Sequence, residues 1–388
     1  MNEEHEDILI KNGNIHDGNG NIFYSTDILV KDGKIKQIAK EIELNEDIPV
    51  YDATDKVVLP GFIESLNIWG CTGPGWGDND LEEHSDPITP QMNVVYSFDQ
   101  DNMMFQRVFE YGITSAGITP GTSNVLGGYA AVFKTFGDHP YKMLIKEKVG
   151  VVGSVSRTTT TVYKDRNMAP MTKMGTFSLL REYLKKAEAY STEMPYDSKL
   201  ISLKDVVEKK TPLFINCNTN SEIVALNHLL KDFDVDLVLT GAYGVNENIL
   251  NMIIDNKLKI IFGDVTNGMS AASQNLNFDV VRELINKNVP ISISSTGDRM
   301  SSGKESLLWN AILFYKNGIN SSDVLKMITS NAAKILSVDD RIGSIEPGKD
   351  ADIVVWTNNP IESYDSKAEA VFINGKNVLG VWRMGSCW

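Results

Sequence analysis

Histidine and cysteine are both scarce in this chain, whose 388 residues include five histidines and three cysteines. The cysteines, Cys71, Cys217 and Cys387, lie far apart and form no Cys-x-x-Cys pair, so we expect neither structural disulfides nor a zinc–cysteine site. Free cysteines are typical of a reducing compartment, and the predicted location is therefore the cytoplasm. The chain also lacks a run of eighteen apolar residues, so no transmembrane helix is expected.

Basic residues are fewer than acidic ones. The chain has 37 lysines and arginines and 51 aspartates and glutamates, which gives a formal net charge of −14. No basic cluster stands out along the sequence, so neither nucleic acid nor a membrane is an expected partner. Four of the first seven residues are acidic and none is lysine or arginine, whereas a secretory signal starts with basic residues and continues with an apolar stretch. We therefore expect no secretory signal.

Short β-strands are predicted at both ends of the chain, and no helical stretch interrupts them. Near the N-terminus, strands at 27–30 and 34–38 flank the hairpin signal Asp32-Gly33. Near the C-terminus, residues 351–356 form a similar apolar run. Two β-rich ends around a different middle predict one small domain that both termini build together.

Strands and amphipathic helices alternate through the middle of the chain. Apolar strands are predicted at 212–215, 235–239, 259–262 and 289–293, and a helix at 278–285. Such alternation over about 280 residues predicts an α/β fold, namely a (β/α)8 TIM barrel. A doubly wound sheet is the alternative from pattern alone, but it would usually carry a glycine-rich turn after its first strand, and no such motif is present.

The predicted domains are a composite β-sandwich of residues 1–58 and 341–388 and a barrel of residues 59–340. In a TIM barrel the chemistry lies at the C-terminal ends of the strands. We expect those ends at 64–68, 114–121, 216–220, 240–244, 264–266 and 294–298.

Val58-Leu59-Pro60-Gly61-Phe62-Ile63-Glu64 resembles the opening of the amidohydrolase superfamily, in which Pro-Gly-Phe-Ile-Asp precedes a His-x-His pair on the first barrel strand. Residues 341–352 are similar to the family's return from barrel to β-sandwich. Segments 120–128 and 171–175 resemble its imidazolonepropionase-like branch. The resemblance implies a barrel with a composite β-sandwich, and a hydrolase of C–N bonds other than peptide bonds, as in cyclic amides.

The metal ligands that this resemblance implies are missing at the matching positions. The family holds one or two metal ions by His-x-His on the first strand, a histidine on the fifth and on the sixth, and an aspartate on the eighth. The residues here are Leu66 and Ile68, Asn216 and Asn218, Thr240 or Gly241, and Thr296. Zinc binds imidazole, thiolate and carboxylate, so we predict a degenerate metal site, no metal ligand and no cofactor. A divalent cation held weakly by oxygen atoms of this region is the alternative.

Two aspartates at predicted strand ends are the candidate catalytic residues. Asp298 follows the eighth strand and Asp264 the seventh, and either could act as a general acid or base or orient a water molecule. The alternative is an aspartate that caps a loop or helix. His84 follows the first strand on the mouth side and is a candidate substrate contact, although an acidic solvated loop explains it equally well.

A glycine-containing loop supplies further candidate substrate contacts. Gly127 and Gly128 would let the backbone approach a ligand closely, and in the branch that the chain resembles this segment, with Asn124 and Tyr129, lies near the substrate. A tight connection that needs glycine is the alternative interpretation.

Strand alternation predicts that Asn216 and Asn218 point into the barrel and that Cys217 points out, which makes the two asparagines candidate substrate contacts. Lys173 could meet a ligand carboxylate, although such a lysine is more often a solvated surface charge. Some relatives carry a carboxylated lysine that bridges two metals; for Lys134 we expect a salt bridge or a substrate contact instead.

Three functional hypotheses follow. The chain is a divergent hydrolase of the family with a rearranged metal site, a non-catalytic pseudoenzyme that binds a small molecule or a protein, or an enzyme that uses Asp298 as acid/base without metal. The missing ligands favour loss of the usual metal-dependent activity. The expected partner is a small molecule in the barrel mouth. Formation of a homo-oligomer is a further possibility, because dimers are common in the family that the chain resembles.

Overall fold

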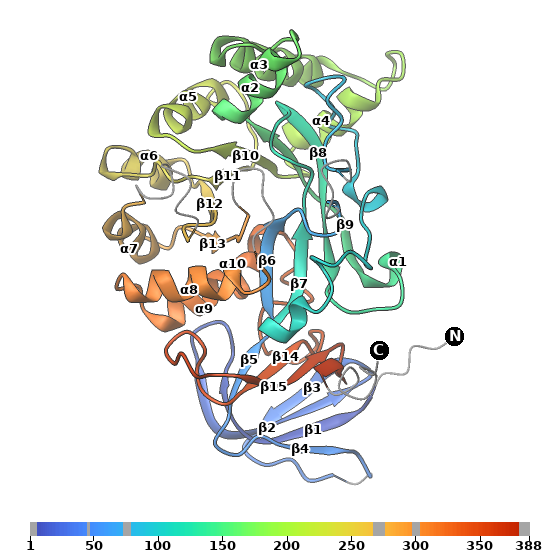
Figure 1. Cartoon of the computed structure of the whole chain (residues 1–388), viewed down its shortest axis with the longest axis vertical. Coiled ribbons are helices and arrows are strands. Elements are labelled where there is room, and N and C mark those ends of the chain that lie inside the picture. Colours follow the sequence, from blue (N-terminus) through green and yellow to red (C-terminus); the bar gives the residue numbers. More distant parts are fainter. Residues whose placement is uncertain (1–5, 45–46, 73–78, 267–275, 297–302, 380–388) are drawn as a thin grey trace.

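The structure is a computed structural model that describes residues 6–44, 47–72, 79–266, 276–296 and 303–379. Two sheets organise it: one forms a barrel, and the other forms a β-rich domain below the barrel as drawn in Figure 1. Across the described segments, none of the helices combines the length and the apolar character needed to span a membrane.

Eight strands form the barrel sheet, in the order in which they occur along the chain. They are β6 (Phe62–Asn67), β7 (Ile113–Ile118), β8 (Leu126–Lys134), β9 (Leu144–Ser154), β10 (Leu213–Cys217), β11 (Leu237–Gly241), β12 (Lys259–Phe262) and β13 (Ile291–Ile293). The last strand returns to the first, where Ser65 of β6 and Ser292 of β13 are hydrogen-bonded through their hydroxyls. The predicted barrel is therefore confirmed as a nearly closed sheet.

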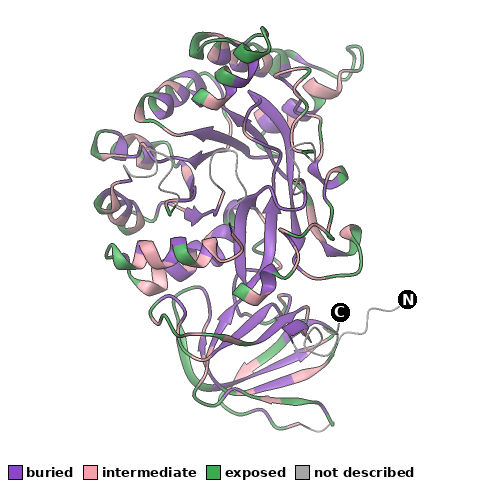
Figure 2. Cartoon of the chain, viewed as in Figure 1, coloured by how far each residue is buried: buried purple, intermediate pink, exposed green. Residues whose placement is uncertain are grey.

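Helices cover the barrel from β9 onward, where strand and helix alternate as predicted (Figure 1). They are α2 (Arg157–Asp165), α3 (Lys173–Ala189), α4 (Ser198–Val207), α5 (Asn220–Leu230), α6 (Leu250–Asp255), α7 (Phe278–Asn286), α8 (Ser306–Lys316), α9 (Ser321–Met327) and α10 (Ser330–Ile335). Figure 2 shows the consequence: the barrel strands are buried, and exposed residues lie on the outer faces of the helices.

The first part of the barrel departs from a uniform strand–helix repeat. β8 runs antiparallel to both β7 and β9. The connection from β8 to β9, residues 135–143, holds only the short helix α1 (Pro140–Met143), and a parallel crossover needs a dozen residues or more. Between β6 and β7 the described residues contain the short 3₁₀ helices η1 (Val94–Tyr96) and η2 (Val108–Tyr111).

The barrel interior is filled by side chains of alternating strand positions, as the two-residue period of a strand requires. Phe214 of β10, Val238 of β11 and Ile261 of β12 pack there with Ile63 and Val132. The intervening residues pack outward against the helices; Cys217, for example, is fully buried in that outer cluster. A packed interior closes the barrel below the strand ends, so ligands are restricted to its mouth.

Both termini build the β-rich domain, as predicted. Its sheet has the order β16-β15-β14-β5-β1-β2-β3, and β4 pairs with β1. The strands are β1 (Ile8–His16), β2 (Ile22–Lys31), β3 (Lys34–Ala39), β4 (Val50–Asp52), β5 (Val57–Pro60), β14 (Ile353–Trp356), β15 (Ala368–Ile373) and β16 (Lys376–Asn377). The sheet curls so that the segment before β14 reaches the β3 edge. There the amide of Ala351 donates to the Gly33 carbonyl at 2.8 Å.

A buried ionic cluster joins the two domains. Lys134, at the end of β8, contacts Asp352 at 2.5 Å and Asp350 at 3.0 Å, and all three side chains are almost fully buried. Arg341 contacts Asp350 at 2.8 Å from the other side. Lys134 therefore forms a salt bridge at the domain junction, away from the barrel mouth.

Candidate functional site

A cavity of about 40 Å³ lies at the C-terminal ends of the barrel strands. Its lining is entirely uncharged: Leu66, Thr119, Thr122, Val152, Asn216, Thr240, Gly241, Tyr243, Ile261, Gly263, Ser294 and Thr296. Because a water molecule needs roughly 10–15 Å³ of such space, the cavity holds only a few non-hydrogen atoms. It therefore suits one polar group of a ligand whose remainder lies further out in the mouth.

Two polar groups of this lining, on adjacent strands, have no hydrogen-bond partner among the described residues. Asn216 on β10 and Thr240 on β11 are paired neighbours in the sheet. Asn216 accepts a hydrogen bond from Asn218 at 3.3 Å through Oδ1, while its Nδ2 makes no hydrogen bond to any described residue. The Thr240 hydroxyl likewise lacks a partner within the described part of the chain, although Thr240 is only 6% exposed. An amide donor and a hydroxyl are thus left side by side for a ligand.

Four other hydroxyls of the cavity, those of Thr119, Tyr243, Ser294 and Thr296, are used within the protein. Thr296 donates to the Leu66 carbonyl at 2.5 Å, and Ser294 donates to the same oxygen. Thr119 donates to the Pro120 carbonyl at 2.9 Å. These bonds fix part of the rim. The β10–β11 pair, together with the Thr122 hydroxyl, for which no hydrogen bond to a described residue is found, is what the cavity offers a ligand.

The family's metal does not fit this set of donors. Leu66 has no ligand atom, and its side chain packs into the interior cluster. Asn216, Thr240 and Thr296 offer neutral oxygen and nitrogen atoms, which are poor zinc ligands. Among the described residues, no group of three or more histidine, cysteine, aspartate or glutamate side chains is placed to hold an ion.

Glu64 lies beside this site but not in its lining. It is fully buried and accepts hydrogen bonds from the Ser295 amide at 3.0 Å and from the Ser295 hydroxyl at 2.5 Å. Burial raises the pKa of Glu64 to about 7, against the lowering effect of these hydrogen bonds. The carboxyl therefore braces the first strand against the end of the eighth.

His84 has both ring nitrogens engaged. Its Nε2 lies 3.1 Å from Glu82 Oε2, and its Nδ1 lies 3.2 Å from Arg166 Nη2. Burial alone would raise the pKa of Glu82, but hydrogen bonds from His84 and Ser123 hold it below its ordinary value. In this arrangement the imidazole orients the loop above the mouth and has no free nitrogen to offer a substrate.

The predicted glycine-containing loop is mostly strand. Gly127, Gly128 and Tyr129 begin β8, and Tyr129 is only 2% exposed. Gly128 has a positive φ of 146°, and its backbone lies against Met92, where a side chain would collide. None of the three lines the cavity.

Asn124 connects the loops around the mouth without reaching the cavity. Its Nδ2 donates to Thr89 Oγ1 at 2.9 Å and to the Glu83 carbonyl at 3.0 Å. Its Oδ1 accepts from the Tyr163 hydroxyl at 2.6 Å. This amide is fully used inside the protein, at 1% exposure.

Of the remaining candidates, one forms an ion pair, one caps a loop and one lies outside the described residues. Lys173 contacts the buried Glu222 at 2.8 Å, and the other oxygen of Glu222 accepts from the Asn218 amide at 2.8 Å. Asp264 accepts the amide and the hydroxyl of Thr266 at 2.8 and 2.6 Å and so caps its own loop. Asp298 lies outside the described residues.

Several lining residues were not predicted individually. Tyr243, Thr119, Thr122 and Gly263 all lie in or beside the strand ends that the sequence indicated. Only their position at the strand ends could have identified them from the sequence, because neutral side chains in a loop do not by themselves indicate a binding or catalytic role. Side-chain direction decides which of them face the cavity.

Comparisons with known proteins agree with this architecture. The Amidohydrolase family model matches residues 171–386, which is more than half of the chain. The chain belongs to the amidohydrolase family. Among solved structures, an amidohydrolase from Thermotoga maritima MSB8 superimposes with a TM-score of 0.87 at 28% identity, covering 96% of this chain and 99% of that one.

Curated members of the family are more distant. Amidohydrolase tasK of Hapsidospora irregularis is 22% identical over 89% of this chain, which spans 39% of that protein's length. Imidazolonepropionase of Picrophilus torridus is 21% identical over 94% of this chain and 95% of its own. Dihydropyrimidinase of Dictyostelium discoideum shares 50% identity over 58 residues, 15% of this chain and 11% of its own. The imidazolonepropionase match supports the predicted branch.

Proposed function

We propose that this member of the amidohydrolase family has lost the family's metal-dependent hydrolysis and binds the amide group of a small uncharged molecule in the barrel mouth. The observation that carries the proposal is the pair of unpartnered polar groups, Asn216 Nδ2 and the Thr240 hydroxyl. An amide carbonyl could accept from Asn216, and the adjacent N–H could donate to Thr240.

The apolar part of the lining supports a ligand whose amide is flanked by hydrocarbon, of which only the atoms next to the amide enter the small cavity. Leu66, Val152 and Ile261 contribute aliphatic side chains from three strands. A few placed polar groups on an apolar surface are typical of small-molecule sites. Cyclic amides, whose ring carries one amide edge, match both features.

The neutral lining also predicts discrimination by charge. A ligand carboxylate would lose its hydration without gaining a cation among the lining residues. The chain's net charge of −14 would repel it further. A neutral dihydropyrimidine should therefore bind better than the same ring with a carboxylate.

Isothermal titration calorimetry with dihydrouracil and dihydroorotate tests this directly. Dihydrouracil should bind, and dihydroorotate should bind at least about tenfold more weakly. Thr240→Val and Asn216→Leu should each weaken dihydrouracil binding by about fivefold, because each removes one hydrogen bond of roughly 1 kcal/mol. Thr161→Val, on the exposed surface of α2, is the matched control and should change nothing.

The hydrolytic alternative is tested on the same samples. Protein expressed with added Zn²⁺, Mn²⁺ and Fe²⁺ should contain no stoichiometric metal by elemental mass spectrometry, and should leave dihydrouracil intact in a chromatographic assay. Stoichiometric metal together with ring opening would overturn the proposal. So would dihydrouracil affinity that both cavity variants leave unchanged.

A further inference from the structure

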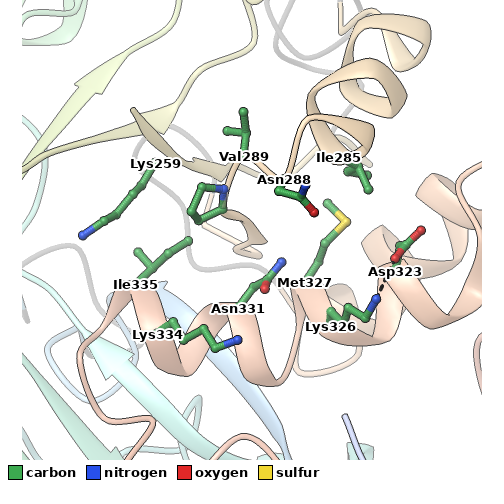
Figure 3. A pocket seen from close by; sticks show the side chains of 11 residues that line it. Lys259, Ile285, Asn288, Val289, Asp323, Lys326, Met327, Asn331, Lys334 and Ile335 are labelled. Carbon is green, nitrogen blue, oxygen red and sulfur yellow. Dashed lines mark hydrogen bonds and ion pairs between the residues drawn. The ribbon is translucent and has the colours of Figure 1, made fainter. Parts of the chain in front are cut away.

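A second cavity, of about 310 Å³, lies at the opposite end of the same strands. Lys259 begins β12, and Val289 and Pro290 directly precede β13, whereas the mouth cavity is lined by residues that follow these strands. The opposite wall comes from α9 and α10 (Figure 3). The two cavities are therefore separated by the packed barrel interior, and this one has no part in the proposed mouth site.

The wall of this cavity has an apolar part and a cationic part, and it also includes one carboxylate, Asp323, and two amides, Asn288 and Asn331. Ile285, Val289, Pro290, Met327 and Ile335 supply the apolar part. Lysines from three separate elements supply the cationic part: Lys259 of β12, Lys326 of α9 and Lys334 of α10. Figure 3 shows Lys326, Asn331 and Lys334 along the helical side, with Val289 across the cavity from them.

The lysine charges are only partly compensated. Lys259 pairs with Asp236 at 2.7 Å, and Lys326 pairs with Asp323 at 3.0 Å. Lys334 has no ion-pair partner within the described part of the chain. One ammonium group beside an apolar wall is thus left free, in a chain whose overall charge is −14.

Asn331 adds an ordered polar group between the lysines. Its Nδ2 donates to the Ile291 carbonyl of β13 at 3.0 Å, which fixes the side chain against the strand. The cavity therefore combines a fixed amide, lysine ammonium groups and an apolar wall, an arrangement that suits a molecule with an anionic head and an apolar body.

We propose that the cavity between β12, β13 and the helices α9 and α10 binds an amphipathic small anion, a carboxylate or a phosphate monoester with an apolar body. The head group pairs with Lys334 and lies near Lys326. The apolar body packs along Val289 and Met327.

Titration calorimetry at low ionic strength with octyl phosphate, octanoate and octylammonium tests the charge preference. The net charge of the chain would favour the cation at any nonspecific site, so stronger binding of either anion requires a local cationic site. We expect each anion to bind at least about tenfold more tightly than octylammonium. The stronger of the two anions identifies the head group, and either order supports the proposal.

Substitutions at Lys334 locate the binding. Lys334 is exposed on its helix, so Lys334→Gln should fold normally and weaken anion binding by about fivefold. Lys334→Glu should abolish anion binding and strengthen octylammonium binding. Lys36→Gln, an exposed lysine of β3 in the other domain without an ion pair among the described residues, should have no effect.

A spectroscopic readout places the ligand independently of affinity. The Met327 side chain lines the cavity and is 1% exposed, so its ¹³C-methyl resonance, assigned through Met327→Leu, should shift with octyl phosphate. Octylammonium binding as strong as the anions, anion affinity unchanged in both Lys334 variants, or an unshifted Met327 resonance at saturation would each overturn the proposal.

Discussion

Replacing Glu64 by glutamine should remove a pH dependence from the stability of the folded chain. Burial raises the pKa of Glu64 to about 7 in the folded state, from an ordinary value of 4.5. The folded state therefore holds its proton more tightly than the unfolded state does. The stability that this proton contributes is fully present below pH 4.5 and is lost as pH rises through about 7.

The size of the effect follows from the same two values. A change from 4.5 to about 7, at about 1.4 kcal/mol for each tenfold change in proton affinity, gives about 3 kcal/mol. Glutamine mimics the protonated carboxyl because it cannot ionise. Its single oxygen, at the position of Oε2, can accept from both the Ser295 amide at 3.2 Å and the Ser295 hydroxyl at 2.5 Å. Glu64→Gln should therefore leave stability near wild type at acid pH and raise it by about 3 kcal/mol above neutral pH.

Urea unfolding followed by tryptophan fluorescence, from about pH 4 to about pH 8, measures this difference. Subtracting the variant from the wild type cancels every other titrating group that the two share. Glu193→Gln, at an exposed carboxyl, is the control and should give a flat difference. A flat difference for Glu64→Gln, or a wild type that gains relative stability as pH rises, would refute the assignment of Glu64 as a buried acid.

Three further predictions follow from the structure. Lys134→Met should destabilise the chain by about 3–5 kcal/mol in urea unfolding, because Asp350 and Asp352 lose their buried cation. Lys56→Met, the control, breaks only an exposed pair with Glu369 and should cost less than about 1 kcal/mol. Equal losses of stability in the two variants would contradict this reasoning. In a Cys387→Ser variant, Cys71 and Cys217 should react with a thiol reagent only after unfolding, because both side chains are buried. Burial also raises the pKa of the Cys71 thiol to about 12, which keeps it in the unreactive protonated form. Rapid labelling of the folded protein would contradict this prediction. Added Zn²⁺ should leave the melting temperature of chelator-treated protein unchanged, whereas an ion that bound the folded state specifically would raise it.

The barrel and the composite β-rich domain could be predicted because their signals are local and repeated. Apolar strands of three to five residues recur between amphipathic helices from β10 to β13, and their ends fall where the polar cavity residues lie. The antiparallel strand β8 was not predicted. A fully buried strand shows no alternation, so its direction depends on the length of the following connection rather than on its own residues.

Individual site residues were harder to predict than strand ends. Asn216 and Thr240 share the cavity because β10 and β11 pair in register, which strand spacing suggests. Lys173, by contrast, was considered as a ligand contact and lies in an ion pair with Glu222, a residue of another helix. Contacts of that kind depend on how helices pack, and a single sequence carries no period that encodes them.

The packing also shows why the fold does not depend on the family's metal ligands. The positions of the metal ligands that the resemblance implies lie at the strand ends or just beyond them, whereas Phe214, Val238 and Ile261 form the interior below. Leu66 has joined that interior at 5% exposure, so the first-strand position now contributes to packing. Leu66→His alone would bury an imidazole without a metal and lose aliphatic contacts, which costs stability and gains no ligand set.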